Sequence, residues 1–217
     1  MNYKIIKFED IEYPSNLRYI FDPPRVLYCL GNISLLNNIC IAIIGCRESS
    51  SYGNKVAKYF SNRLSQAGIT VVSGLAHGID GVAHKYSLNN IGRTIAVLGS
   101  GLDIVYPREN ESLYNDILKN GGLIISEFPF GTKPLKENFP KRNRIVSGLS
   151  HGVLVVEAKR KSGTSITVDF ALEQGRDVYV VPGNIDSENS EGTNELIKQG
   201  AYLVTNPNEI LCKLKWY

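Results

Sequence analysis

Five apolar runs, each of which stops at a glycine-rich or polar turn, are the feature of this sequence that most limits its fold. They span residues 41–44, 70–72, 94–98, 153–156 and 178–181. All five are rich in β-branched residues and none alternates with polar ones, which is typical of strands buried on both faces of a parallel sheet. Their alternation with helical segments predicts an α/β fold with a doubly wound, mostly parallel sheet of about seven strands.

Amphipathic segments fill most of the spaces between these runs. The spacing of their apolar residues predicts helices at 51–67, 80–88, 110–120, 142–149, 165–174, 194–199 and from residue 207 onward. Two further strands are expected at 123–126 and 201–204. A loop that contains prolines is expected over 128–140.

The first forty residues lack this alternation of strands and helices because prolines interrupt them, although residues 26–30 could add an edge strand. We therefore predict one domain overall, in which an N-terminal extension over 1–40 packs on a core over 41–217. A chain of 217 residues with 43% hydrophobic and 21% charged residues is sufficient for one full core. It has no apolar stretch of membrane-spanning length and no signal-peptide pattern, so we expect a cytoplasmic protein.

The turns that follow the apolar runs are expected to meet along one crevice, because parallel strands all end at the same edge of a sheet. Glycines in such turns let a ligand approach the backbone, and helix N-termini offer free N–H groups to anions. The candidate ligand contacts in these turns are Gly45, Gly74, His77, Gly78, Gly99, Gly101, Ser162, Gly163 and Thr164. Tight turns and helix caps would also account for these residues.

A basic segment over 133–161 contains eight Lys or Arg residues against two glutamates, whereas the whole chain carries a net charge of only +3. Within it, Phe139 stands among Lys136, Lys141, Arg142, Asn143 and Arg144, and Lys161 ends the segment. An aromatic ring with neighbouring cations is the combination that binds single-stranded nucleic acid. From composition alone, Phe139 could equally be a loop anchor and the cations a solvated surface.

Several function classes lack support in the sequence. The run Gly99-Ser100-Gly101 has only the first two glycines of a dinucleotide fingerprint, because Ile104 occupies the third position. No P-loop, metal-ligand spacing or nucleophile–base pair is evident, and His84 is most simply a packing residue on a helix. We therefore expect no metal, no cofactor and no catalytic residue.

The sequence resembles the DNA-processing protein A family, also called Smf, in its core domain only. The motifs that carry this resemblance are Tyr13-Pro14, Gly45-Cys46-Arg47, Tyr52-Gly53, 73–80, Ala83-His84, Thr94–Leu98, Gly101-Leu102-Asp103, 106–110, Ser126-Glu127, 139–145, Gly148-Leu149-Ser150, Val156-Glu157-Ala158, Ser162-Gly163 and Val181-Pro182-Gly183. They occur in the family's order and spacing from Tyr13 to Ala201. One departure is Cys46, which stands where a serine or threonine is usual.

The resemblance implies an extended Rossmann-like core that binds and protects single-stranded DNA, forms homodimers and loads a RecA-type recombinase during natural transformation. It implies that Arg47, Lys136 and Phe139 contact the DNA. It also implies that the protein is not an enzyme. Many members of this family add a helical domain and a winged-helix domain to the core, which the resemblance does not cover.

Two other function classes stay open from the residues alone. A phosphoribohydrolase-like enzyme or nucleotide sensor of similar fold would carry a Pro-Gly-Gly-x-Gly-Thr turn. The nearest stretch here, Ser162-Gly163-Thr164, lacks the leading Pro-Gly-Gly. A scaffold for an acidic protein partner would use the basic face but leave the glycine turns without a role.

The C-terminal segment predicts self-association. A last strand and an apolar helix stand at the end of the sheet, where an exposed edge needs protection. The residues expected at a dimer interface are Leu203, Ile210, Leu211 and Leu214. The alternative is that the helix folds back on its own sheet.

Overall fold

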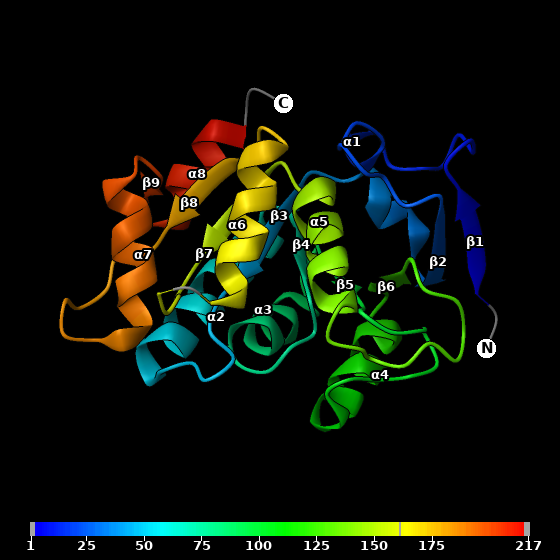
Figure 1. The fold of residues 1–217 in the computed structure, drawn as a ribbon, viewed down its shortest axis with the longest axis horizontal. Coiled ribbons are helices and arrows are strands. Elements are labelled where there is room, and N and C mark those ends of the chain that lie inside the picture. The colour runs from blue at the N-terminus through cyan, green and yellow to red at the C-terminus, as the bar shows by residue number, and fades with distance from the viewer. Residues whose placement is uncertain (1–2, 161, 215–217) are drawn as a thin grey trace.

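The computed structural model describes residues 3–160 and 162–214, and nine strands in this part of the chain form one sheet (Figure 1). The strands are β1 (Lys4–Lys7), β2 (Val26–Gly31), β3 (Cys40–Ile44), β4 (Thr70–Ser73), β5 (Thr94–Val97), β6 (Leu123–Ser126), β7 (Gly152–Val155), β8 (Asp177–Val180) and β9 (Tyr202–Leu203). Their order across the sheet is β1-β2-β6-β5-β4-β3-β7-β8-β9.

Strands β3 to β9 are the seven parallel strands that the sequence predicts. The N-terminal extension adds two antiparallel strands, because β2 pairs with β6 and β1 pairs with β2. Residues 26–30 do form a strand, but the expectation that it is an edge strand is wrong, because β1 pairs with its outer side and is itself the edge. The doubly wound, mostly parallel α/β fold is confirmed.

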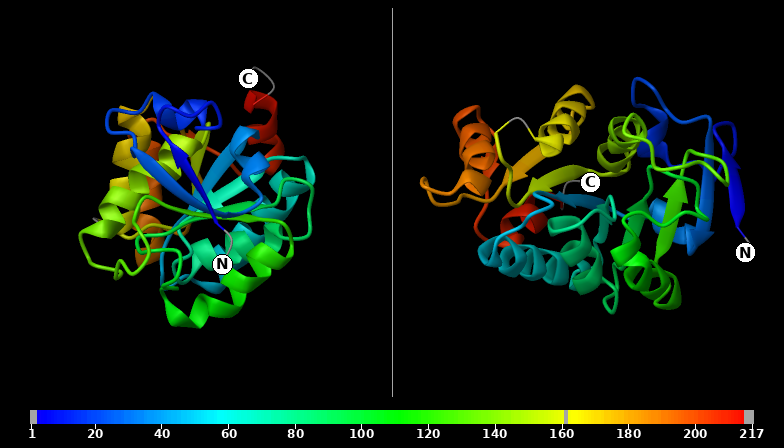
Figure 2. Two further views of the ribbon diagram at one scale, coloured as in Figure 1. Left: turned by 90° about the vertical axis from the view of Figure 1, so that its right-hand side faces the viewer. Right: turned by 60° about the horizontal axis from the view of Figure 1, so that its bottom comes forward.

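Helices cover both faces of the sheet. They are α1 (Ser15–Arg18), η1 (Ile33–Asn37), α2 (Ser51–Gln66), α3 (Ile79–Ser87), η2 (Arg108–Asn110), α4 (Glu111–Lys119), α5 (Asn138–Leu149), α6 (Gly163–Glu173), α7 (Glu188–Lys198) and α8 (Pro207–Leu214). Helices α1, α5, α6 and α7 pack on one face, and α2, α3, α4 and α8 pack on the other (Figure 2). Within β3, Ala42 and Ile44 face the first layer while Ile41 and Ile43 face the second. Burial on both faces explains why the run has no polar alternation.

Two helices begin a full turn or more before the residue that the sequence predicts. Helix α5 starts at Asn138 rather than Arg142, so Phe139 and Pro140 lie in its first turn instead of a loop. Proline is tolerated in a first helical turn because its missing N–H would have no intrahelical acceptor there. Helix α7 starts at Glu188, and the acidic side chains of Glu188 and Glu191 in its first turn suit the positive end of the helix dipole.

Helix α8 folds back on its own sheet. Ile210 and Leu214 are 0% and 4% exposed and pack in the same cluster as Phe60 of α2. These two residues are therefore core residues, and the expectation that they form a dimer interface is wrong. Leu203 stays half exposed and Leu211 partly exposed. Among the described helices, none has the length and apolarity needed to cross a membrane.

Candidate functional site

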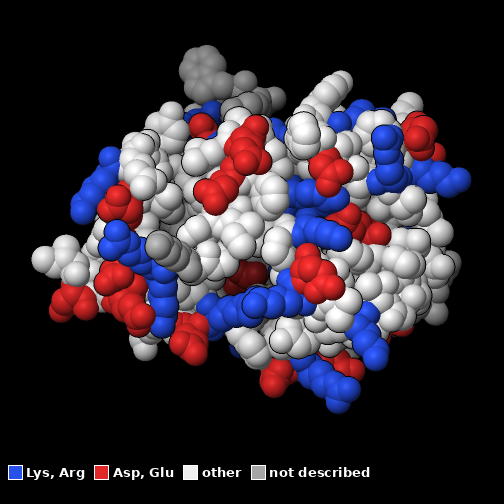
Figure 3. Space-filling view, in the orientation of Figure 1, with Lys and Arg blue, Asp and Glu red and all other residues white. Residues whose placement is uncertain are grey.

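A cleft of about 770 Å³ opens where the strand order reverses, between β3 and β7. The turns after β3, β4 and β7 meet here together with the starts of α5 and α6, as expected for a ligand site in a doubly wound sheet. Figure 3 shows a hollow near the middle of this face with Lys and Arg side chains along its lower border. The charged residues that line the cleft are Arg47, Glu48, Asp80, Lys136, Arg142 and Lys159.

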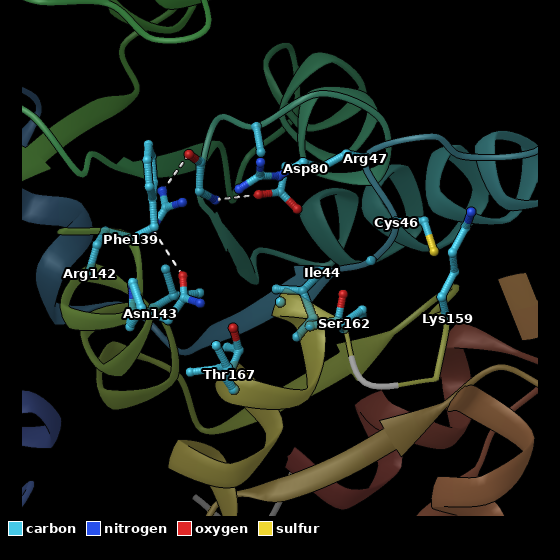
Figure 4. A pocket seen from close by; sticks show the side chains of 18 of the residues that line it. Ile44, Cys46, Arg47, Asp80, Phe139, Arg142, Asn143, Lys159, Ser162 and Thr167 are labelled. Atoms are coloured by element: carbon cyan, nitrogen blue, oxygen red, sulfur yellow. Dashed lines mark hydrogen bonds between the residues drawn. The ribbon is translucent and has the colours of Figure 1, made fainter. Parts of the chain in front are cut away.

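An aromatic ring on α5, that of Phe139, lines one side of the cleft (Figure 4). The guanidinium carbon of Arg47 is 5.7 Å from the centroid of the Phe139 ring, and that of Arg142 is 6.0 Å away. The ring of Tyr106 lies 5.6 Å from the same centroid at an angle of 43°, and it is 45% exposed. Tyr106 was not predicted as a site residue from the sequence. Its exposed ring extends the aromatic surface that Phe139 provides.

The side chain of Arg142 is hydrogen-bonded to other groups of the protein. Its side chain is buried, and its guanidinium donates hydrogen bonds to the backbone carbonyls of Gly74 and Val97. Its Nε also donates to Oδ1 of Asn143 at 3.2 Å. Burial lowers the pKa of Arg142 to about 10, while the nearby charge of Asp80 opposes that shift. Arg142 therefore joins the turn after β4 to the end of β5 rather than presenting a free cation for a phosphate.

Asp80 holds the other side of the same turn. Its carboxylate accepts the N–H of Gly74 at 3.1 Å, so Gly74 is bonded to Asp80 through its N–H and to Arg142 through its carbonyl. Burial raises the pKa of Asp80, and the guanidinium of Arg142 opposes this. The turn that faces the cleft is thus fixed from both sides before any ligand arrives.

His84 anchors the next residue of this turn. Its Nε2 accepts the N–H of Leu75 at 3.3 Å, and its Nδ1 lies 2.7 Å from the hydroxyl of Thr94. Since that hydroxyl donates to the carbonyl of Val71, the bonding pattern assigns the proton of the ring to Nδ1. Burial lowers the pKa of His84 to about 3, so the imidazole is neutral. His84 is buried in the packing, as expected, and its ring also bonds α3 to the turn after β4 and to β5.

Arg144 lies away from the cleft. Its guanidinium donates to both carboxylate oxygens of Glu127, at 3.0 and 2.7 Å, and to Asp22 at 3.0 Å. Burial alone would lower its pKa, but the bonds to these two carboxylates raise it. The expectation that Arg144 contacts a ligand conflicts with this geometry, because its donors are already satisfied by the N-terminal extension and the end of β6.

The start of α6 forms the far wall of the cleft. Ser162, Gly163 and Thr164 line it together with Thr167, and the hydroxyl oxygen of Ser162 is buried without a hydrogen-bond partner. The N-terminus of α2 differs, because Ser50 caps it and the carboxylate of Glu157 bonds the N–H of Ser50. The expectation that helix N-termini here are free for anions therefore fails for α2.

The remaining predicted residues take different places. Lys136 and Asn143 line the cleft, as do Gly45 and Gly74, whereas Lys141 and His77 are exposed beside it. Gly99 lies under the ring of Phe139, and Gly101 packs against the loop at Pro129. Gly78 has a φ of +71° and presses so closely on the backbone of Cys46 and Arg47 that no side chain would fit there. Lys161 lies outside the described residues.

Cations at the mouth of the cleft differ in their partners. Lys159 Nζ lies 3.1 Å from Glu188 and 3.7 Å from Glu48, and the bond with Glu188 raises the pKa of Lys159. Arg47 and Lys136 take part in none of the ion pairs found within residues 3–160 and 162–214. In the same part of the chain, no cluster of three His, Cys, Asp or Glu side chains could hold a metal ion.

Known proteins share both the sequence and the fold. The chain is 47% identical to the protein Smf of Escherichia coli over 99% of its own length and 58% of the relative's, so it spans little more than half of that protein. The structure of DNA processing protein A from Streptococcus pneumoniae superposes with a TM-score of 0.92 at 42% identity, covering 98% of this chain and 74% of that one. For DNA processing protein A from Helicobacter pylori, in a structure concerned with its single-stranded DNA binding mode, the TM-score is 0.90 at 34% identity, with 100% and 98% covered.

A match to the sequence model of a protein family identifies the family of this chain. The model for DNA recombination-mediator protein A matches residues 4–215, which includes the N-terminal extension, all nine strands and the whole cleft. The resemblance drawn from the sequence motifs is therefore confirmed. The chain belongs to the DNA recombination-mediator protein A family, whose members include the Smf and DNA processing A proteins.

Proposed function

We propose that the cleft between β3 and β7 binds single-stranded DNA. The observation that carries this proposal is that the ring of Phe139 lines the cleft with the guanidinium of Arg47 5.7 Å from its centroid, and that Lys136 lines the same cleft. Neither cation takes part in an ion pair within the described residues. Bases stack on aromatic rings while Lys and Arg neutralise the phosphates of the strand. Tyr106 extends the stacking surface. The binding mode described for the Helicobacter pylori relative, which shares the fold at a TM-score of 0.90, supports the same ligand.

The proposed role is binding rather than catalysis. The two buried carboxylates near the cleft, Asp80 and Glu157, are bonded to backbone N–H groups of the protein itself. Arg142 is likewise bonded to backbone carbonyls. These groups shape the walls, and none is positioned to activate a water molecule or to attack a substrate. We accordingly propose that the protein needs no cofactor to act on DNA.

In the cell, the proposal extends to recombination. Relatives that match over most of this chain are DNA processing proteins, and the family model is that of a recombination mediator. We propose that this protein holds incoming single strands during natural transformation and passes them to a RecA-type recombinase in the cytoplasm. Homodimers would place two clefts on one strand and raise the effective affinity without new contacts.

The test is a direct comparison of ligands. Fluorescence anisotropy would measure the affinity of the purified protein for a short oligothymidylate, for a duplex of the same length and for a nucleoside monophosphate. Tight binding of the single strand with weak binding of the duplex supports the proposal. A preference for the duplex contradicts it. Tight binding or hydrolysis of the monophosphate would instead favour a nucleotide-binding enzyme, for which the unpartnered hydroxyl of Ser162 would be the phosphate contact.

A further inference from the structure

One buried residue fastens the turn that carries Arg47 at both of its ends. The backbone carbonyl of Glu157 accepts the N–H of Cys46 at 3.0 Å, just before Arg47. The carboxylate of Glu157 accepts the N–H of Ser50 at 3.0 Å and also the hydroxyl of Ser50, just after the turn. A single residue at the end of β7 therefore fixes both flanks of a turn that follows β3.

Glu157 is enclosed on all sides by this arrangement. It is 2% exposed, and a Cβ at Gly53 would come within 2.3 Å of its carboxylate, so a side chain there would displace the carboxylate. The carboxylate lies at the N-terminus of α2, where the positive end of the helix dipole and the Ser50 N–H stabilise its charge. Within the described residues it takes part in no ion pair.

Further contacts hold the middle of the turn. Asn189 Nδ2 donates to the carbonyl of Glu48 at 2.9 Å and lies 3.5 Å from the carboxylate of Glu157. On the other side, the N–H of Ile79 donates to the carbonyl of Cys46 at 3.2 Å. The backbone on both sides of Arg47 is thus restrained, although its side chain is exposed. The guanidinium keeps its position 5.7 Å from the ring of Phe139 on this support.

We infer that Glu157 is a positioning residue for single-stranded DNA, which sets the place of Arg47 in the cleft without touching the strand. The inference rests on the proposed function. The direction of the change in DNA affinity on replacing Glu157 separates a positioning role from a simple effect of charge. Removing a carboxylate close to a polyanion site should strengthen binding through electrostatics alone, since one repulsive charge is lost. Removing a positioning residue should weaken binding, because Arg47 then samples conformations that do not meet a phosphate.

The test uses Glu157→Gln, which keeps the shape of the side chain, and Glu157→Ala, which removes both acceptors. We expect Glu157→Gln to weaken the affinity for oligothymidylate about fivefold, and Glu157→Ala about tenfold or more. Arg47→Ala should weaken binding too, and adding Glu157→Gln to it should change the affinity by less than about twofold, because Glu157 acts through Arg47. Additive losses in the double variant, or unchanged affinity in Glu157→Gln, would overturn the inference.

Two controls keep these outcomes apart from a general loss of structure. Tyr13→Phe removes a buried hydrogen bond to the carbonyl of Pro24 far from the cleft, and it should leave the affinity unchanged. Amide exchange of the free protein should be faster at Ser50 in Glu157→Ala than in the wild type, because that N–H loses its carboxylate acceptor, and equal exchange would contradict the anchoring role. If the wild type binds no single strand, the proposed function fails and the inference fails with it. If the wild type binds and Glu157→Gln binds equally well, only the inference fails.

Discussion

Arginines that stand close together in the sequence have unlike roles here. Arg142 and Arg144 are two residues apart on α5, yet one bonds the backbone at Gly74 and Val97 and the other pairs with Glu127 and Asp22. Arg47 lies far away in the sequence and is exposed against the ring of Phe139. Charge alone does not mark a contact residue, since a guanidinium whose donors are satisfied internally has little left to offer a phosphate.

Phe139 gives the sharpest test among single residues. Phe139→Ala should lose about 1–3 kcal/mol of binding free energy for a single strand, because a base loses its stacking surface. Phe139→Tyr keeps the ring and should bind like the wild type. Titration of oligothymidylate measures both. If Phe139→Ala lowers the thermal midpoint while its affinity per folded molecule stays intact, the ring is a structural anchor.

His84 predicts how stability depends on pH. Its pKa is lowered to about 3 in the folded protein from an ordinary value of 6.5, so the unfolded chain binds a proton first as the pH falls. This contribution is complete above about pH 6.5 and is lost at up to about 1.4 kcal/mol per pH unit below it. Urea unfolding of the wild type should therefore show about 1–2 kcal/mol less stability at pH 5 than at pH 6.5.

The matched variant is His84→Gln, whose amide does not titrate. It should start from a lower stability, because the bond to Thr94 is lost, and it should show a flatter pH profile. Part of the slope should persist, since burial also lowers the pKa of His151. Identical slopes in the wild type and in His84→Gln would contradict a neutral, buried His84.

At the scale of elements, the seven parallel strands were predictable, whereas β1 and the starts of α5 and α7 were not. Apolar runs such as 153–156 mark strands because both faces of the sheet exclude water, which leaves a pattern in the sequence itself. The start of α5 at Asn138 left no such pattern, because Pro140 reads as a loop residue although a first helical turn accepts it. Contacts between distant segments, such as Glu157 with Ser50, leave no local signal either.

The site residues, too, were predictable from the sequence only where a local pattern marks them. The cleft and the start of α6 were expected from turns that follow parallel strands, Lys136 from the basic segment and Arg47 from the family resemblance, and the structure brings them together. The internal pairing of Arg144 was not foreseeable, because Asp22 and Glu127 lie 122 and 17 residues away from it. Tyr106 was also missed, since its distance from Phe139 depends on how the loop before η2 packs on the first turn of α5.

Arg144 yields a prediction about how α5 is attached to the N-terminal extension. Arg144→Ala should destabilise the fold by about 3–5 kcal/mol, because it leaves the largely buried carboxylate of Glu127 without its partner. The exposed Lys4–Glu12 pair offers a comparison, and Lys4→Ala should cost less than about 1 kcal/mol. Chemical unfolding measures both. Affinity for a single strand, corrected for the folded fraction, should be unchanged in Arg144→Ala, and a loss like that of Arg47→Ala would contradict the internal role.

For the whole molecule, the open question is how the β9 edge is covered. Leu172 and Tyr202 are 61% and 46% exposed and line a second hollow of about 230 Å³, and Leu203 in β9 is 48% exposed. An edge strand with exposed apolar side chains invites pairing with a second copy. A dimer through this face remains a prediction, now without Ile210 and Leu214.

Light scattering at micromolar concentration tests that prediction. The wild type should give twice the chain mass of 24.0 kDa, and Leu203→Glu should give the monomer because a charge would be buried at the interface. Asn208→Glu, an exposed change on the first turn of α8, serves as the control and should stay dimeric. A wild type that scatters as a monomer, with or without DNA, would contradict the dimer.

The central claim, that the cleft between β3 and β7 binds single-stranded DNA through its cations, is tested most directly by the salt dependence of binding. If Arg47 and Lys136 each neutralise one phosphate, the logarithm of the affinity for oligothymidylate should fall linearly with the logarithm of the salt concentration, with a slope of about −1.4. Arg47→Ala should reduce that slope by about 0.7, whereas Arg144→Ala should leave it unchanged. A slope near zero, or equal effects of the two variants, would contradict the account.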